Sequence, residues 1–338
     1  MAKPTCLKGS TNTCKASTNY KQPRHAWPVV FCYENTTPSN PNLQFKMAFG
    51  RSVALPHDRS HLLISDGMPT PLLRQSIGAW TENLLRDDAI TKVPKVGLEI
   101  CANINAKQTG VFAGVAIINQ LLSETSVQID WFIEDGNTIM KGKVATLKGP
   151  NDSILSLERT ILNIIGRLSG IATTTSAWVE AAPCAVACTR KTTWGLLDKW
   201  AVMVGGGLTH RLNKSDALML KENDLTKWGS ISDALAEINP NEWGFVEIEV
   251  TSSEQAMAAV EAWTHLSPLV IMLDNIEAAE CRLIKQQIEK ENIIIEVSGG
   301  ISFNSLQDWH GVDVLSASAL NQGIEHIDFS MLFEGVET

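Results

Sequence analysis

The second half of the chain repeats one pattern, in which short apolar runs rich in β-branched residues alternate with segments of helix length. A strand–helix repeat predicts parallel strands joined by right-handed crossovers. About six or seven such units fit an α/β barrel, which can be incomplete, better than a flat sheet. The six clearest runs are CAVACT, DALMLK, FVEIEV, LVIMLD, IIIEVSG and DVLSAS.

Each of these runs ends in charged or small polar residues, with basic ones first, acidic ones in the middle, and Gly and Ser last. A charge after one strand is more often a solvated loop residue. Because the carboxyl ends of parallel barrel strands converge on one face, six such ends in register predict one shared site. The residues are Arg190 and Lys191, Lys221, Glu249, Asp274, Ser298 with Gly299 and Gly300, and Ser316 with Ala317 and Ser318.

Positive charge is concentrated between Cys188 and Asp224, although the 338-residue chain has a formal net charge of −9. A local cationic cluster in an acidic protein predicts a pocket for a small, multiply charged anion. The acidic balance argues against nucleic acid as the main partner. The cationic candidates are Arg190, Lys191, His210, Arg211 and Lys221.

These residue types predict that different parts of the site bind different chemical groups. Arg and Lys can clamp carboxylates, and Gly/Ser turns after barrel strands can bind phosphate, although SGG is equally typical of a tight turn. Glu249 and Asp274 could bind ribose hydroxyls, hold Mg²⁺ through water, or form strand-end salt bridges. The combination favours phosphoribosyl transfer to an acidic base, and no Ser or Cys nucleophile is evident at a recognisable spacing.

The region from Pro71 to Gly149 predicts a separate α/β unit. Apolar residues at helical spacing follow Pro71, and the pieces VGLEICANI, TGVFAGVAII, SVQIDWFI and KVATLKG are of strand type. We expect a mostly antiparallel sheet, and then a long amphipathic helix with Asp152 or Ser153 as its N-cap.

Residues 1–67 differ in composition from the rest, with no acidic residue before Glu34. The start has no apolar core, which argues against a secretory signal. An organelle transit peptide and a non-native leader are alternatives, but we interpret the segment as a weakly ordered accessory extension of a cytoplasmic protein, whose removal leaves catalysis intact. No window reaches the roughly 20 apolar residues of a membrane helix. The seven cysteines form no CxxC pair, which argues against a zinc site and indicates a reducing compartment. Cys184 and Cys188, which flank an apolar run, are interpreted as buried thiols on or beside a strand.

The motifs ERTILNIIGRLSGIATTTSAWVEA, TRKTT, GGGLTHRL, ALMLKEN, VEIEV, IMLDN, EVSGGI and GVDVLSASAL resemble the quinolinate phosphoribosyltransferase family, in family order, from about Leu72 to Leu332. The resemblance implies an N-terminal α/β sandwich and an open seven-stranded α/β barrel. It implies quinolinate and phosphoribosyl diphosphate as substrates, Mg²⁺ as cofactor, and a homodimer or larger assembly of dimers. We assign residues 1–67 to the extension, 68–168 to the sandwich with 320–338 packing back on it, and 169–319 to the barrel.

By motif match, the resemblance also implies a role for each candidate residue. Arg159 would reach the quinolinate of the neighbouring subunit, and Lys191 would lie between the dicarboxylate and the diphosphate. Glu249 and Asp274 would lie beside the Mg²⁺-bound donor. The dicarboxylate pocket would contain Arg190, His210, Arg211 and Lys221, and the 5′-phosphate would contact Ser298, Gly299, Gly300, Ala317 and Ser318.

The chain departs from the family pattern at several places. Trp194 replaces the usual Pro, the loop before Lys199 is about two residues shorter, Asp224 replaces His, and Ser318 replaces Gly. Three hypotheses follow: a quinolinate phosphoribosyltransferase, a relative that uses another aromatic acid, and a binding protein without catalysis. The first accounts best for the retained cations and carboxylates.

Overall fold

The computed structural model describes residues 55–88 and 97–334. The predictions for residues 1–54 therefore lie outside the described residues. The first helix, α1, spans Pro71–Asp87, where the sequence predicts it. The Thr70 hydroxyl accepts a hydrogen bond from Leu73 N–H (3.3 Å), and Pro71 occupies the first turn, so the N-terminus has a standard cap.

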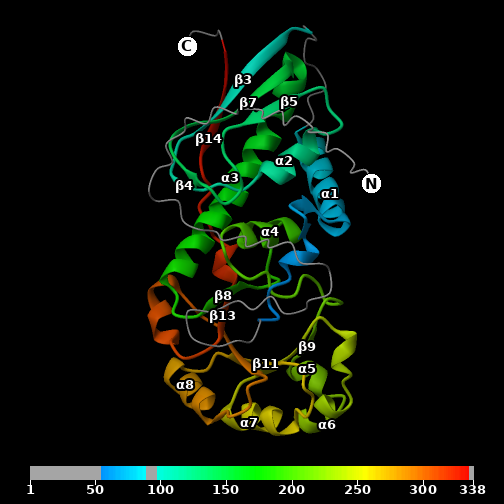
Figure 1. Cartoon of the computed structure of the whole chain (residues 1–338), viewed down its shortest axis with the longest axis vertical. Helices are drawn as coiled ribbons and strands as arrows, with labels where there is room; N and C mark the ends of the chain where they lie inside the picture. The colour runs from blue at the N-terminus through cyan, green and yellow to red at the C-terminus, as the bar shows by residue number, and fades with distance from the viewer. Residues whose placement is uncertain (1–54, 89–96, 335–338) are drawn as a thin grey trace, which may run out of the picture. The chain divides into compact units, whose positions relative to one another are not determined.

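The sandwich unit is built on a four-stranded antiparallel sheet in the order β14-β3-β7-β5 (Figure 1). Its strands are β3 (Glu99–Ala106), β5 (Gln128–Trp131), β7 (Gly142–Pro150) and β14 (Phe329–Phe333). The short strands β1 (Ile64–Ser65) and β2 (Met68–Pro69) pair with each other, as do β4 (Gly110–Val111) and β6 (Thr138–Ile139). The antiparallel sheet confirms the predicted character of this unit, and β14 returns from the end of the barrel to pair with β3.

One predicted strand is wrong. The run TGVFAGVAII contains only the two-residue strand β4, and its second half forms helix α2 (Val115–Leu122). A short apolar run does not distinguish a strand from a buried helix by periodicity alone. Here the Asp135 carboxylate accepts hydrogen bonds from the N–H groups of Gly114, Val115 and Ala116 (2.6–3.1 Å), which caps the helix from a distant part of the chain.

The long helix α3 (Asn151–Ala181) links the two units and contacts β7 and β14 as well as β8 and α4 (Leu196–Val204). Its N-cap is Pro150 and not Asp152 or Ser153. It continues past Leu168, so the boundary that we placed after residue 168 falls inside one continuous helix. Its buried face is nearly unbroken from Ile161 to Ala172, because the helix packs against both units.

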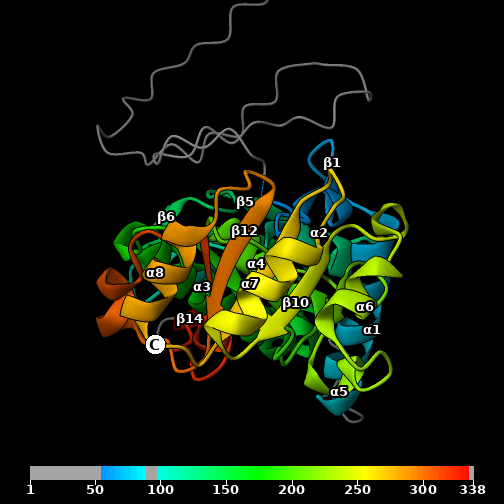
Figure 2. The ribbon, with the colours of Figure 1, turned by 90° about the horizontal axis from the view of Figure 1, so that it is seen from below.

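The barrel unit confirms the strand–helix repeat. Six parallel strands are ordered β8-β13-β12-β11-β10-β9. They are β8 (Ala185–Cys188), β9 (Leu218–Leu220), β10 (Val246–Val250), β11 (Leu269–Asp274), β12 (Ile293–Ser298) and β13 (Val314–Ala317). Figure 2 shows the helices α6 (Ile231–Ala236), α7 (Ser253–Ala262) and α8 (Ala278–Gln287) outside strands β10 and β12. Among residues 55–88 and 97–334, an isolated parallel bridge between Ala187 and Leu208 is all that forms at a seventh position.

The edges of this sheet are β8 and β9, so within the described residues the barrel is open between them. The interior is apolar near the amino ends of the strands, where Ala187, Ala217, Phe245, Val270, Ile294 and Val314 form a cluster. Because side chains alternate along a strand, two residues further on β10 and β12 the interior positions are Glu247 and Glu296. Two residues further again they are Glu249 and Ser298, at the carboxyl ends.

Residues 55–67 are part of the packed fold, unlike the weakly ordered extension to which the sequence analysis assigned them. His57 and Leu63 are fully buried. The Arg59 guanidinium binds the Asp216 carboxylate (2.7 and 3.0 Å), and Arg59 N–H donates to the Thr209 hydroxyl (2.9 Å). Thr209 follows the bridge to β8 and Asp216 precedes β9, so this segment lies across the open side of the barrel.

Candidate active site

The carboxyl ends of neighbouring strands bring four predicted residues into one layer. Lys221, after β9, forms an ion pair with Glu249 of β10. On the next two strands, the Ser298 hydroxyl of β12 donates to the Asp274 carboxylate of β11 (2.6 Å). The strand-end salt bridge weighed as an alternative for Glu249 therefore exists. It does not conflict with a site, because Lys221 remains about half exposed.

The loop after β8 carries Arg190 and Lys191, both exposed. Asp198 and Lys199, two buried residues at the start of α4, hold this loop. The Asp198 carboxylate accepts from the N–H groups of Thr193 (2.7 Å) and Trp194 (3.1 Å) and forms two hydrogen bonds with the Arg167 guanidinium (2.9 and 2.8 Å).

Lys199 connects this loop with the next one. Its side chain is 1% exposed, and its ammonium donates to the carbonyl oxygens of Thr209 (2.6 Å) and Thr189 (3.2 Å). These carbonyls immediately precede His210 and Arg190. One buried cation thus fixes the spacing of the two loops that supply most of the cationic candidates.

Arg211 lies beside the barrel interior and is 7% exposed. Its guanidinium donates to the Ala217 carbonyl (3.3 Å) and contacts Met219 Sδ (3.2 Å), while Nε has no hydrogen-bond partner among the described residues. Burial and the nearby Arg190 lower the pKa of Arg211. A poorly solvated guanidinium with a second, exposed cation nearby favours the binding of an anion.

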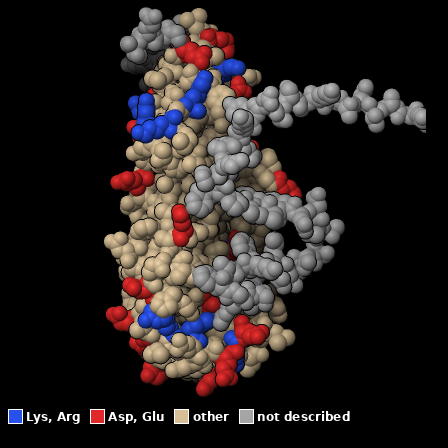
Figure 3. Space-filling model, turned by 60° about the vertical axis from the view of Figure 1, so that its left-hand side comes forward, with Lys and Arg blue, Asp and Glu red and all other residues tan. Residues whose placement is uncertain are grey.

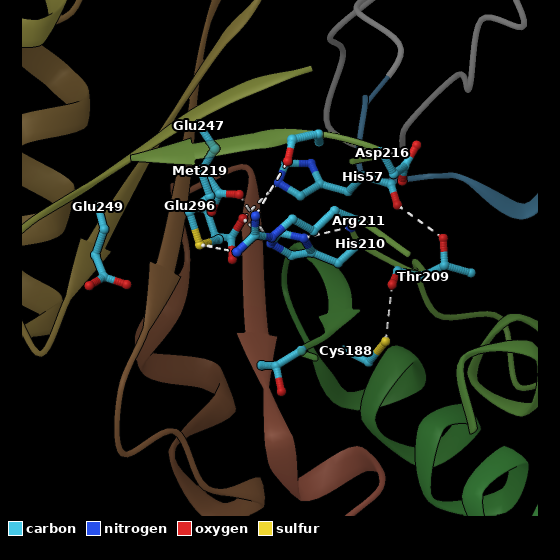
Figure 4. Close-up of polar contacts among 12 residues, drawn as sticks. His57, Cys188, Thr209, His210, Arg211, Asp216, Met219, Glu247, Glu249 and Glu296 are labelled. Carbon is cyan, nitrogen blue, oxygen red and sulfur yellow. Dashed lines mark hydrogen bonds and ion pairs between the residues drawn. The ribbon is translucent and has the colours of Figure 1, made fainter. Parts of the chain in front are cut away.

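His210 is 3% exposed and points into the barrel (Figure 4). Its Nε2 atom lies 3.3 Å from Glu296 and 3.5 Å from Glu247, and His57 Nε2 contacts the same Glu296 oxygen at 2.7 Å. The backbone of His210 is in the left-handed region (φ 52°), which is uncommon for a residue other than glycine. The four side chains form one buried network directly beneath the carboxyl-end layer.

Burial and neighbouring charges have opposing effects on the pKa values of this network. Burial alone would lower the pKa of His210, but Glu247 and Glu296 raise it to about 10. Burial raises the pKa of Glu247, whereas at Glu296 the two histidines outweigh burial and lower it. Arg211 N–H donates to His210 Nδ1 (2.7 Å), so in the neutral ring the proton lies on Nε2. In either charge state the Nε2 atom of His210 carries a proton, and it lies within ion-pair distance of both carboxylates.

The proton on Nε2 of His210 affects whether this cluster can bind a metal ion. Ligand atoms of His57, His210 and Glu296 lie within 4.8 Å of one another, a grouping that could hold an ion. The protonated Nε2 of His210 has no lone pair for a metal, and His210 Nδ1 is engaged with the backbone. We therefore interpret the cluster as a buried network of one hydrogen bond and ion-pair contacts.

Magnesium fits the carboxyl-end layer better. Glu249 and Asp274 lie near the ends of adjacent strands, and each offers carboxylate oxygens at the edge of the barrel. Mg²⁺ is commonly held by one or two carboxylates together with water and substrate phosphates, so this pair suits an ion that arrives with a diphosphate. The magnesium assignment stays a prediction.

The two expected phosphate turns have different constraints. Gly299 and Gly300 have positive φ values (91° and 61°), and a Cβ at Gly299 would lie 2.2 Å from Asn275 Oδ1. Glycine is therefore required at position 299. Ser318 has no positive φ and starts a short 3₁₀ helix (Ser318–Leu320) after Ala317, so replacing the usual Gly causes no backbone strain.

Two further departures from the family pattern have local partners. Trp194 stacks on Trp80 (6.2 Å between ring centroids) and lies 5.3 Å from the Arg167 guanidinium. Asp224 accepts from Lys221 N–H (3.1 Å) and caps the short helix α5 (Glu222–Leu225). Both substitutions shape the loops around the site.

The structure also places residues that sequence reasoning missed. Of the predicted residues, Arg159 is exposed on α3, as a residue that reaches a neighbouring subunit must be. His57, Asp198, Lys199, Glu247 and Glu296 were not among the candidates. The last two could have been found, because a Glu inside the apolar runs FVEIEV and IIIEVSG is an unusual buried acid.

On the face shown in Figure 3, Lys and Arg side chains form small separate groups and not a continuous basic surface. None of the helices in the described part of the chain combines the length and the apolar character that a membrane crossing requires. The fold and the polar strand ends together define an open α/β-barrel protein with a charged site for a small substrate.

Sequence comparison identifies the family. Residues 88–169 match the family model of the quinolinate phosphoribosyl transferase N-terminal domain, and residues 171–332 match that of the C-terminal domain. The chain belongs to the quinolinate phosphoribosyl transferase family.

Individual relatives agree with this assignment. The probable nicotinate-nucleotide pyrophosphorylase (carboxylating) of Bacillus subtilis is 38% identical over 245 residues, which are 68% of this chain and 82% of that protein. Its counterpart from Methanothermobacter thermautotrophicus is 33% identical over 258 residues, 71% of this chain and 91% of that protein. The structure of the nicotinate-nucleotide pyrophosphorylase from Francisella tularensis superposes with a TM-score of 0.70 at 28% identity, covering 77% of this chain and 97% of the other.

Proposed function

We propose that this chain transfers the phosphoribosyl group of phosphoribosyl diphosphate to quinolinate, with loss of CO₂, in the de novo biosynthesis of NAD. The products are nicotinate mononucleotide, CO₂ and diphosphate. The observation that carries the proposal is the layer of Lys221, Glu249, Asp274 and Ser298 on four adjacent strand ends, next to the cationic loops. Membership of the family supports it, because the relatives bear the name of this reaction.

The site has a cationic end for the acceptor. Arg190, Arg211 and Lys221 would hold the two carboxylates of quinolinate, and Lys191 would bridge toward the diphosphate. Burial of Arg211 favours this role, because a poorly solvated guanidinium gains most from a carboxylate partner. Holding the acid here would direct the pyridine nitrogen toward the ribose.

The acidic and Gly/Ser strand ends would position the donor. Glu249 and Asp274 would contact the ribose hydroxyls and hold Mg²⁺, which when bound neutralises charge on the leaving diphosphate. The turns at Gly299 and Ser318 would receive the 5′-phosphate through backbone N–H groups. The carboxylates would also favour the positive charge that develops on the ribose as its bond to diphosphate breaks.

Chemistry at this site needs little from acid–base groups. The pyridine nitrogen attacks C1 of the ribose as diphosphate leaves, so the nitrogen becomes cationic. That cation stabilises the electron pair left at C2 when the 2-carboxylate departs as CO₂, and C2 then takes a proton from solvent. The residues mainly orient the substrates and balance charge.

The proposed active form is a homodimer or an assembly of dimers, in which Arg159 extends into the partner's site. The exposure of Arg159 on α3 supports this part of the proposal. A chain carrying Arg159→Ala mixed with an inactive Lys221 variant would recover activity if sites are shared between subunits.

The decisive assay combines the protein with phosphoribosyl diphosphate, Mg²⁺ and either quinolinate or nicotinate, and follows CO₂, diphosphate and nucleotide. Formation of product with quinolinate as acceptor, and not with nicotinate, supports the proposal. Turnover of a different aromatic acid alone, or tight binding without any turnover, would contradict it. Removing Mg²⁺ with a chelator should stop the reaction, and adding Mg²⁺ back should restore it.

Lys221 provides the matching site test. Lys221→Met should reduce kcat/KM for quinolinate by at least about a hundredfold, because a charged contact to the acceptor is lost, while the melting temperature stays unchanged. Lys214→Met, at an exposed lysine in the preceding turn, is the control and should behave like the unaltered protein. Near-normal turnover by the Lys221 variant would contradict its assigned role.

A further inference from the structure

The N-terminal segment delivers one side chain into the barrel. His57 lies 31 positions before residue 88, where the match to the family begins, and yet it is fully buried among barrel residues. Its ring lies 5.2 Å from the His210 ring and 5.4 Å from Phe245. A histidine brought into the interior from outside the matched region needs an explanation of its own.

Glu296 is shared between two imidazoles. The same oxygen, Oε2, lies 2.7 Å from His57 Nε2 and 3.3 Å from His210 Nε2, while Oε1 has no hydrogen-bond partner among the described residues. A buried carboxylate needs partners to stay charged. His57 therefore supplies the shorter of the two contacts that fix the position of Glu296, and Glu296 in turn fixes His210.

The backbone of the same segment is fastened beside His210. The Thr209 hydroxyl accepts from Arg59 N–H (2.9 Å) and donates to the His57 carbonyl oxygen (3.4 Å). The Arg59 side chain is anchored on Asp216. Residues 57–59 thus hold the loop Thr209–Arg211 through hydrogen bonds to Thr209, the residue immediately before His210. In the same loop, Arg211 is the buried cation of the proposed acceptor pocket.

We propose that His57 is a positioning residue for the acceptor end of the active site. Through Glu296 and His210 it holds the Thr209–Arg211 loop in the conformation that binds the dicarboxylate. This inference rests on the proposed function. It makes the N-terminal segment a component of the site. It assigns that component to quinolinate, because the contacts lead from Glu296 through His210 to the Thr209–Arg211 loop, whereas the proposed contacts of phosphoribosyl diphosphate lie at the carboxyl ends of β10 to β13.

The alternative is that His57 only fills space, and substitutions at this position separate the two. His57→Phe keeps an aromatic ring but cannot donate to Glu296. His57→Gln can donate an amide N–H from nearly the same position as Nε2, and His57→Asn is one bond too short to do so. A packing role predicts that Phe is tolerated best, whereas a positioning role predicts that Gln is.

The experiment measures the steady-state constants of these variants for both substrates, with melting temperatures. For His57→Phe and His57→Asn we expect the KM for quinolinate to rise about tenfold, equivalent to about 1.4 kcal/mol, with the KM for phosphoribosyl diphosphate within twofold of the unaltered protein. His57→Gln should return the quinolinate KM to within threefold. His61→Phe and His61→Gln, at an exposed histidine of the same segment, are the controls and should change neither constant.

The outcomes separate this inference from the proposed function. Equal effects on both substrates, or a Phe variant that outperforms the Gln variant, would overturn the role of His57. If Phe fails to fold, the comparison of Gln with Asn decides. If the unaltered chain does not turn over quinolinate, the proposed function fails, and dissociation constants for quinolinate, measured by calorimetry on the same variants, still test His57.

Discussion

The pair Arg167–Asp198 gives the sharpest test of how the loop after β8 is held. Asp198 is fully buried and Arg167 is 8% exposed. The carboxylate receives two hydrogen bonds from the guanidinium and two from the loop N–H groups of Thr193 and Trp194. Asp198→Asn keeps the shape but removes the charge, and its amide NH₂ must face either the guanidinium or the loop.

The expected loss follows from these contacts. Breaking a buried ion pair by removing one partner costs about 3–5 kcal/mol, because the remaining charge stays buried. Asn retains one acceptor oxygen, so we expect the low end, about 3 kcal/mol. That is a large share of the roughly 5–15 kcal/mol by which proteins are stable, and it lowers the ratio of folded to unfolded protein more than a hundredfold.

The assay is equilibrium unfolding in urea, with kcat/KM for quinolinate measured where the variant is folded. Glu82→Gln breaks an exposed ion pair with Arg86 and is the control, because such pairs contribute little. A midpoint for Asp198→Asn equal to that of the control would refute the reasoning. The double variant Arg167→Met with Asp198→Leu should recover part of the stability, since no charge is left unpaired, but not the activity, since the loop N–H groups still lack an acceptor.

Three other predictions concern the rest of the fold. A chain without residues 1–54 should keep normal kinetic constants, whereas one without residues 1–67 should lose activity and stability, because it lacks His57 and its anchors; kinetics and thermal melts compare the two. Lys199→Met should raise the KM for quinolinate at least about tenfold, since the carbonyls of two loops lose a charged donor; an unchanged KM would contradict this. Burial raises the pKa of Cys184 to about 12, so above about pH 9 the unfolded chain loses this proton and the folded chain keeps it. The free energy of unfolding should then fall by about 1.4 kcal/mol per pH unit because of this thiol. When the free energy of unfolding is measured by urea unfolding at several pH values above about 9, it should fall less steeply with pH for Cys184→Ala than for the unaltered protein.

Local sequence information predicted much of the fold. Alternation of short apolar runs and helical segments was sufficient for all six barrel strands, although β9 has only three residues and none of them is β-branched. It failed for the run TGVFAGVAII, where the carboxylate of Asp135 caps α2 from about 20 residues away. It also ended the long helix too early, because α3 is stabilised by packing against both units and not by a local signal near Leu168.

For the candidate site too, the sequence predicted one part and the tertiary structure was needed for the rest. Lys221, Glu249, Asp274 and Ser298 were predicted because each lies at the end of its own strand, where parallel strands must bring them together. Their pairing as Lys221 with Glu249 and Asp274 with Ser298 required the register of the sheet.

The amino-acid sequence by itself determined the order of strands and helices, the polarity of the strand ends and the family. Tertiary structure alone decided how the acceptor loops are held, through His57, Asp198, Lys199 and Glu296. His57 and Glu296 are 239 positions apart. A buried polar group leaves no periodic pattern in the sequence, and its partner is specified only when the folded barrel brings the two together and excludes water from both.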